Sequence, residues 1–210
     1  PTDSTSCFGV TKTGVFLIDD VKMKAQVKLG NQTLSIDAIN QRREDGHQLI
    51  LFTPRMGNMT HTNHRGFEIV LSNLKLPVTV DYQSTFKIRH FGKKGNNLIP
   101  PNGGVLSFRF KRNKQLFSQL KQEQSGKIQI SFEPPKWKNV KYAIGGRLRL
   151  IKNGRIHPKI VQFHNAAKTH IPGKRSPSLV LSYEPRTALG FNKEKLFLIV
   201  VDGRQPNYST

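Results

Sequence analysis

Carboxylates are scarce in this sequence, and only 13 of the 210 residues are Asp or Glu. Asp202 directly follows the apolar run Leu196–Val201 and precedes Gly203 and Arg204. The ends of central strands are places where sites are commonly built, which favours a functional carboxylate here. Asp-Gly is also among the commonest turn dipeptides, and spacing alone favours a turn.

Glu68 lies within the apolar run Phe67–Leu71. An unpaired carboxylate in such a run would be costly to bury, so Glu68 needs a partner or a function. Two roles are open: a catalytic carboxylate, or a buried ion-pair partner of an arginine such as Arg43. Asp37, which alternates with Ile36 and Ala38, is predicted on the outward face of a strand.

The chain is strongly basic, because 34 Lys and Arg against 13 Asp and Glu give a net charge of +21. Such an excess predicts anionic partners: nucleic acid, an anionic membrane or cell-wall polymer, or phosphorylated small molecules. The cations are spread along the chain, so a solvated basic surface is the alternative. The pair His61 and His64 lacks a neighbouring carboxylate or cysteine, and neither a metal nor a cofactor is predicted. No apolar run approaches the ~18 residues of a membrane span.

The elements that position these residues are predicted to be mainly short strands punctuated by Gly, Pro and Asn. The predicted strands are Val15–Ile18, Lys24–Leu29, Thr33–Ile39, Leu49–Phe52, Phe67–Leu71, Val78–Tyr82, Thr85–His90, Val105–Phe110, Lys127–Phe132, Arg147–Ile151, Ile160–Phe163 and Leu196–Val201. The last run is continuously apolar, which is typical of a central strand buried on both faces. One helix is predicted over Asn113–Gln124. The predicted fold class is α+β: a single domain, residues 1–210, with a β-rich mixed sheet and few helices.

Several motifs, taken in order, resemble the phosphodiester glycosidase family. The strongest stretch begins with Pro185-Arg186-Thr187-Ala188-Leu189-Gly190, continues through the strand Leu196–Val201 and closes with Asp202-Gly203-Arg204-Gln205. Weaker matches lie upstream. These are Asn40 and Arg43 before Leu49–Pro54, the glutamate-containing strand Phe67–Val70, Ile99–Gly104, and Ala143–Gly146. Together the matches run from about Phe8 to Ser209.

Two features of the family pattern are missing. The family has a DGGGSS-type motif and a helix after its DGRQ motif, whereas this sequence ends at Thr210. The amino-terminal segment of the family, with an asparagine and paired glycines, is not recognisable either. Three interpretations stay open: a second chain completes the active site, the chain is a fragment, or it is not a working enzyme.

The resemblance implies a hydrolase that cleaves a sugar-1-phosphodiester, as in N-acetylglucosamine-1-phosphodiester, or a phosphate-containing exopolysaccharide. Arginine forks would hold the phosphate through bidentate hydrogen bonds. Carboxylates would act at the glycosidic centre. The implied catalytic residues are Asp202 and Glu68. The implied substrate-binding residues are Arg204, Arg186, Arg43, Asn40, Thr187 and Ser209. They are expected to converge on one cleft of a secreted or periplasmic protein.

Two non-catalytic alternatives remain. One is a nucleic-acid-binding module, which the charge and the interleaved aromatics of Thr85–His90 and Val105–Phe110 would serve. However, alternation in a strand would point the aromatics to one face and the cations to the other, and the common nucleic-acid motifs are lacking. The second alternative is a basic protein that binds an anionic cell-surface glycan without turning it over.

Overall fold

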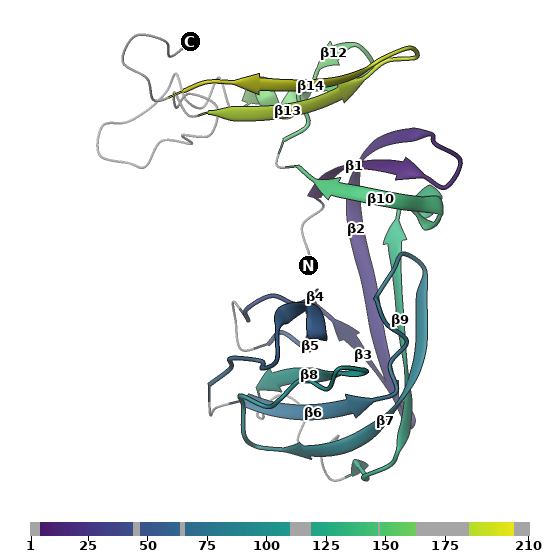
Figure 1. Cartoon of the computed structure of the whole chain (residues 1–210), viewed down its shortest axis with the longest axis vertical. Coiled ribbons are helices and arrows are strands. Elements are labelled where there is room, and N and C mark those ends of the chain that lie inside the picture. The colour runs from purple at the N-terminus through teal and green to yellow at the C-terminus, as the bar shows by residue number, and fades with distance from the viewer. Residues whose placement is uncertain are drawn as a thin grey trace. The chain divides into compact units, whose positions relative to one another are not determined.

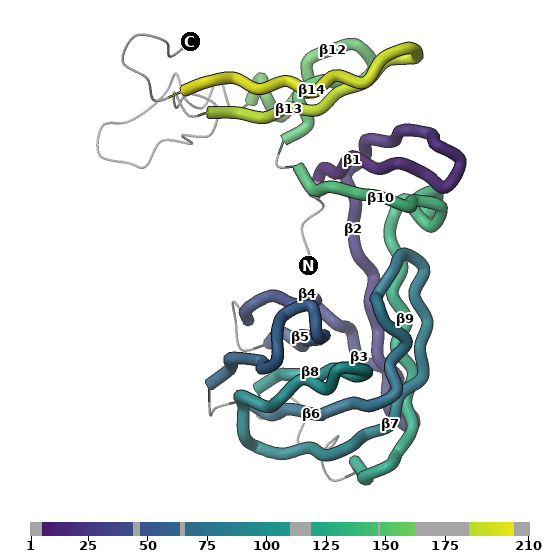
Figure 2. The backbone as a smooth tube through the Cα atoms, in the orientation of Figure 1, coloured from purple at the N-terminus to yellow at the C-terminus, as the bar shows by residue number. Residues whose placement is uncertain are grey.

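The computed structural model describes residues 5–43, 47–63, 66–109, 119–146, 148–162 and 185–203 (Figures 1 and 2). The first half of the predicted helix Asn113–Gln124 lies outside these ranges, and in its described half only residue 119 is helical. The predicted site residues Arg204 and Ser209 also lie outside the described ranges. The described chain forms two compact units. The first unit contains residues 21–141, and the second contains residues 5–20 and the chain from 142 onward.

The first unit is built on one mixed sheet with the strand order β3-β2-β9-β7-β6-β8-β5-β4. All neighbours are antiparallel except β4 and β5, which are parallel. The strands are β2 (Phe16–Leu29, whose residues from 21 onward belong to this unit), β3 (Gln32–Ile36), β4 (Ala38–Ile39), β5 (Ile50–Phe52), β6 (Gly66–Ser72), β7 (Tyr82–Gly92), β8 (Gly103–Arg109) and β9 (Ser125–Glu133).

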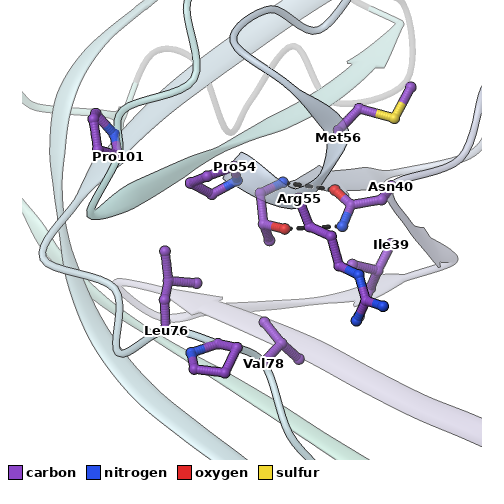
Figure 3. A pocket seen from close by; sticks show the side chains of 10 residues that line it. Ile39, Asn40, Pro54, Arg55, Met56, Leu76, Val78 and Pro101 are labelled. Carbon is purple, nitrogen blue, oxygen red and sulfur yellow. Dashed lines mark hydrogen bonds between the residues drawn. The ribbon is translucent and has the colours of Figure 1, made fainter.

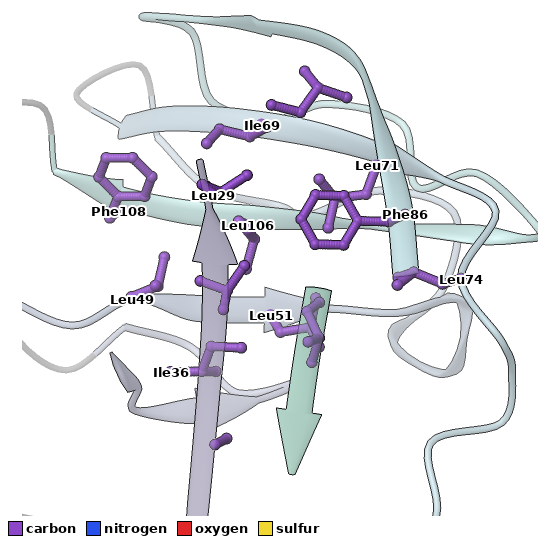
Figure 4. Close-up of a cluster of buried hydrophobic side chains, with 14 of the residues drawn as sticks. Leu29, Ile36, Leu49, Leu51, Ile69, Leu71, Leu74, Phe86, Leu106 and Phe108 are labelled. Carbon is purple, nitrogen blue, oxygen red and sulfur yellow. The ribbon is translucent and has the colours of Figure 1, made fainter. Parts of the chain in front are cut away.

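Strict alternation of apolar and polar residues explains why β2, β7 and β9 form this sheet. In β7 the side chains of Tyr82, Phe86 and Ile88 are buried, whereas Lys87 and Arg89 between and beyond them are exposed. Strands from both ends of this order contribute to one main core. Leu51, Ile69, Phe86 and Leu106 belong to it (Figure 4), as do Val27 and Ile128. The sheet therefore encloses its core by curling. Figure 1 shows β6 and β8 running across β2 and β9, and β7, which pairs with both β9 and β6, bends from one direction to the other.

The strands β5, β6 and β8 are buried on both faces, unlike β7 on the other side of β6. A second, smaller core lies on their other face and consists of Ile50, Phe52, Val70, Ile99 and Val105. Register explains the grouping, because Val70 is paired with Val105 and Val105 with Phe52. The segment 53–63 includes the short 3-10 helix η1 (Pro54–Met56), and Met56 packs against this second core. This doubly covered part of the sheet also carries Glu68.

The second unit consists of short strands and an aromatic cluster. Its strands are β1 (Thr5–Thr11), the first residues of β2, β10 (Val140–Gly145, from 142 onward), β11 (Ile151–Lys152), β12 (Arg155–Ile156), β13 (Arg186–Phe191) and β14 (Leu196–Val201). The rings of Phe8, Phe16 and Phe191 lie 5.6 to 6.1 Å apart by their centroids. This cluster joins β1, the start of β2 and β13.

The prediction that Leu196–Val201 is buried on both faces is wrong. The run does form a strand, β14, with the predicted bounds. Its six side chains are 40 to 74% exposed. Within the described strands β14 pairs with β13 only, and a two-stranded ribbon leaves its faces open.

Several predicted boundaries also need correction. Val78–Tyr82 is not a strand; only Tyr82 belongs to one, at the start of β7. Residues 158–162 are helical, which corrects the strand predicted at Ile160–Phe163, and Pro158 suits a helix start because it needs no N–H there. Of the strand predicted at Arg147–Ile151, Arg147 lies outside the described residues, and among residues 148–151 only Ile151 lies in a strand. The predicted strands Val15–Ile18 (from Phe16 onward) and Lys24–Leu29 belong to the single strand β2.

Asp37 interrupts the strand predicted over Thr33–Ile39. It lies between β3 and β4, and its carboxylate accepts a hydrogen bond of 2.7 Å from the backbone N–H of Leu49. Its prediction as an outward strand residue is therefore corrected. The described fold is β-rich with one mixed sheet and few helices, and none of its helices is long and apolar enough to cross a membrane.

Candidate functional site

A groove of about 760 Å³ opens on the first unit (Figure 3). Its walls come from the end of β4, the segment with η1 after β5, the loop after β6 and the turn before β8. The lining residues are Ile39, Asn40, Thr53, Pro54, Arg55, Met56, Leu76, Pro77, Val78 and Pro101. Most of these side chains are apolar, so the few polar groups among them fix what the groove is able to bind.

Asn40 is the predicted site residue that lies in this groove. Its side-chain amide donates to the hydroxyl of Thr53 and accepts from the backbone N–H of Thr53, both at 2.8 Å. Its backbone is left-handed, with φ of 54°, a conformation that Asn tolerates better than most residues. One amide N–H and one carbonyl lone pair remain for a ligand. The structure therefore presents Asn40 as an oriented hydrogen-bonding group.

Arg55 supplies the positive charge of the groove and was not predicted from the sequence. Its side chain extends past Asn40 toward Ile39 (Figure 3). Arg55 is exposed, and it forms no hydrogen bond or ion pair with another residue in the described part of the chain. A guanidinium that is free of internal partners is available to an anion such as a phosphate.

Glu68 is fully buried and well supplied with hydrogen bonds. Its Oε1 accepts from the hydroxyl of Thr62 at 2.7 Å, and its Oε2 accepts from the hydroxyl of Thr60 at 3.2 Å. Oε2 also accepts from the backbone N–H and the side-chain amide of Asn97, at 3.1 and 2.8 Å. Four donors from two loops thus hold this carboxylate on the same face of β6 as the second core.

Arg43 lies near Glu68 without a direct ion pair between them in the described residues. Its guanidinium donates to the hydroxyl of Ser107 at 2.9 Å, and Ser107 is the residue paired with Glu68 across β6 and β8. Burial lowers the pKa of Arg43, and the negative charge of Glu68 opposes that shift. The Nε of Arg43 is buried without a hydrogen-bond partner in the described structure.

The remaining predicted residues lie in the second unit. Arg186 opens β13 opposite Val201, the residue that closes β14, so Arg186 and Asp202 are at the same end of the hairpin. Thr187 follows in β13 and is exposed, as is Asp202. The predicted site residues therefore form two groups: Asn40, Arg43 and Glu68 in the first unit, and Arg186, Thr187 and Asp202 in the second. Among the residues that the structure describes, no cluster of three or more His, Cys, Asp or Glu could hold a metal.

The mixed sheet of the first unit and the hairpin of the second define a β-rich protein. The model of the phosphodiester glycosidase family matches residues 75–210, which is well over half of the sequence, and the chain belongs to this family. The match includes Arg186, Thr187, Asp202, Arg204 and Ser209. The groove residues Asn40 and Arg55, together with Glu68, precede it.

Two solved structures share the fold. A hypothetical protein from Synechocystis has a TM-score of 0.70 and 13% identity, over 94% of this chain and 34% of that protein. A protein from Burkholderia pseudomallei K96243, described as "Putative exported protein", has a TM-score of 0.63 and 11% identity, over 99% of this chain and 47% of that protein. The chain thus spans a third to a half of their lengths. No curated protein matches it.

Proposed function

We propose that this chain carries part of the active site of a hydrolase acting on a sugar-1-phosphodiester or a phosphate-containing polysaccharide. The observation that carries the proposal is the groove in which the exposed guanidinium of Arg55, which has no partner among the described residues, lies beside the oriented amide of Asn40. The charge of Arg55 suits a phosphate, whereas the amide of Asn40 suits a sugar hydroxyl. Family membership supports the same substrate class.

Hydrolysis of a sugar-1-phosphodiester depends little on a general acid, because the phosphate is already a good leaving group. Positioning and charge stabilisation are then the larger share of catalysis. In this proposal Arg55 binds the phosphate and Asn40 binds a sugar hydroxyl in the groove of the first unit. Arg186, Thr187, Arg204 and Ser209 are the substrate-binding residues proposed for the second unit. Asp202 is the proposed carboxylate at the glycosidic centre, since it is exposed at the end of β14.

Glu68 suits a supporting role better than direct attack on the substrate. Both of its oxygens already accept hydrogen bonds, and its side chain is fully buried. A nucleophile or general acid needs an oxygen that reaches the substrate. We therefore propose that Glu68 fixes the loops with Thr60, Thr62 and Asn97 and places its charge near Arg43.

The second candidate is a protein that binds an anionic polymer without hydrolysing it. The net charge of +21 favours this alternative, because it attracts polyanions whether or not they are cleaved. In either case we propose a location outside the cytoplasm, because one of the two similar structures is described as exported.

The test measures release of free sugar from an N-acetylglucosamine-1-phosphodiester by the full chain and by the variants Asp202→Asn and Arg55→Ala. Arg42→Ala is the matched control, since Arg42 is exposed and does not line the groove. Asp202→Asn should abolish turnover, and Arg55→Ala should raise KM about tenfold or more through loss of phosphate binding. Turnover that survives in both variants would refute the proposed roles. A parent without turnover that still binds the phosphodiester would favour the non-catalytic candidate.

A further inference from the structure

The outward face of the sheet in the first unit is polar and exposed along strands β3, β2, β9 and β7. These strands bury alternate side chains in the main core, so the other half of their residues points outward. The exposed outward residues are Thr33 and Ser35 in β3, Lys22, Lys24, Gln26 and Lys28 in β2, Ser125, Lys127, Gln129 and Ser131 in β9, and Gln83, Thr85, Lys87 and Arg89 in β7. We call this surface the outer sheet face.

Strand register aligns these residues in rows across the four strands. One row is Ser35–Gln26–Gln129–Gln83, and the next is Thr33–Lys28–Lys127–Thr85. Neighbouring strands are ~4.8 Å apart and successive outward residues along a strand ~6.8 Å apart, so a row spans about 14 Å. A line of amides and hydroxyls thus runs beside a line that contains two ammonium groups.

The pair Lys28 and Lys127 is an electrostatic feature that the fold does not need. The two residues are directly opposite each other in neighbouring antiparallel strands, an arrangement in which like charges destabilise a sheet. Lys24 and Lys87 have carboxylate partners in Glu133 and Glu123, but no ion pair involves Lys28 or Lys127 in the described structure. An anionic ligand bound between them would remove the repulsion.

The polar side chains beside Lys28 and Lys127 indicate which uncharged groups the ligand carries. The amides of Gln26, Gln129 and Gln83 form no side-chain hydrogen bond to other described residues, so each is free to bind hydroxyl groups. None of the residues of the outer sheet face is aromatic. The rings of Phe86 and Tyr82 in β7 point into the core instead. A face that binds single-stranded nucleic acid usually stacks bases on aromatic rings. Hydroxyl groups with intermittent negative charge therefore suit this face better than nucleobases.

From these rows we infer that the outer sheet face binds a linear acidic polysaccharide, with Lys28 and Lys127 on its anionic groups and Gln26, Gln129 and Gln83 on its hydroxyls. The site is separate in its residues from the groove with Arg55 and Asn40. It needs no hydrolysis, so its test is independent of the proposed function. It would hold a polymeric ligand to the protein whether or not the chain cleaves it.

The experiment titrates the full chain with a fluorescent oligomer of polygalacturonate and follows fluorescence anisotropy. The double variant Lys28→Gln/Lys127→Gln should weaken binding about tenfold or more and flatten its salt dependence, since two charge contacts are lost. The variant Gln129→Ala should weaken binding severalfold at every salt concentration. Neutral dextran should not compete. Thermal unfolding of each variant confirms that it is folded.

The matched control is Lys75→Gln/Lys94→Gln, which removes two exposed charges away from the outer sheet face. It should leave the affinity within about twofold of the parent. An equal loss in both double variants would overturn the inference, because net charge alone would then explain the binding. Tighter binding of a single-stranded oligonucleotide with the same number of charges, lost in the same Lys28/Lys127 variant, would also overturn it in favour of nucleic acid.

Discussion

Asn97 donates two hydrogen bonds to the same oxygen of Glu68, one from its backbone N–H at 3.1 Å and one from its side-chain amide at 2.8 Å. The two residues are 29 positions apart in the sequence. Thr60 and Thr62 bind the same carboxylate from a second loop. The buried side chain of Glu68 therefore links the two loops by hydrogen bonds on the face of β6 that carries the second core.

The Glu68→Gln variant should lose at least about 2 kcal/mol of unfolding free energy. All four partners of Glu68 donate, so an amide nitrogen in place of one oxygen would face a donor and leave it unsatisfied. Urea unfolding followed by circular dichroism measures the loss. The exposed Glu123→Gln is the control and should change stability by less than about 0.5 kcal/mol. A Glu68→Gln protein as stable as the parent would show that the network contributes little.

Gly95 allows the same two loops to approach each other. A Cβ atom at this position would lie 2.1 Å from the carbonyl oxygen of Asn63 and 2.6 Å from the hydroxyl of Thr62. Gly95→Ala should therefore force the loops apart and destabilise the protein by about 1–3 kcal/mol. Gly92→Ala is the matched control, because a Cβ there meets nothing within 4 Å. Equal melting temperatures for the two variants would contradict this account.

Lys28→Glu should separate the stability of the sheet from the function of the outer sheet face. It replaces a like-charge pair with an opposite-charge pair facing Lys127, which should stabilise the fold by about 0.5–1 kcal/mol. The same change should weaken binding of polygalacturonate. Differential scanning calorimetry and anisotropy measure the two effects on one preparation. A variant that loses both stability and binding would indicate a structural role for Lys28 instead.

Cys7 should react slowly with alkylating reagents. Burial raises the pKa of its thiol, and the negative charge of Asp20 raises it further. A raised pKa means less thiolate at pH 8, and the thiolate is the nucleophile. Iodoacetamide labelling followed by mass spectrometry should be slower than for free cysteine and somewhat faster in Asp20→Asn. Labelling as fast as that of free cysteine would contradict a raised pKa for this half-buried thiol.

The sequence was most informative where burial follows a local period. Alternation in Lys24–Leu29 and Thr85–His90 predicted strands that the structure contains in β2 and β7. The resemblance to the phosphodiester glycosidase family, drawn from short motifs, is confirmed by the family match. Both signals lie in runs of consecutive residues, which a single sequence displays directly.

Features that depend on distant partners were harder to predict. The exposure of Leu196–Val201 depends on what packs against the strand, and its composition cannot reveal that. Arg55 was not predicted because the residues next to it in the sequence form no recognisable motif. The groove that contains Arg55 depends on Leu76–Val78, which are distant in the sequence but line the same groove. The partners of Glu68 lie 6 to 29 residues away in the sequence. The sequence therefore indicated that a buried Glu68 needs hydrogen-bond partners but did not identify them.

The exposed ribbon β13–β14 has a consequence for the behaviour of the chain in solution. Leu196–Val201 is a six-residue apolar segment with strong β propensity and no charge, and such a segment exposed at a strand is a template for intermolecular pairing. The net charge of +21 acts against this by electrostatic repulsion between molecules. Colloidal stability therefore depends on electrostatic repulsion exceeding the attraction between apolar strands. Added salt favours self-association, because its ions screen the repulsion and leave the apolar attraction unchanged.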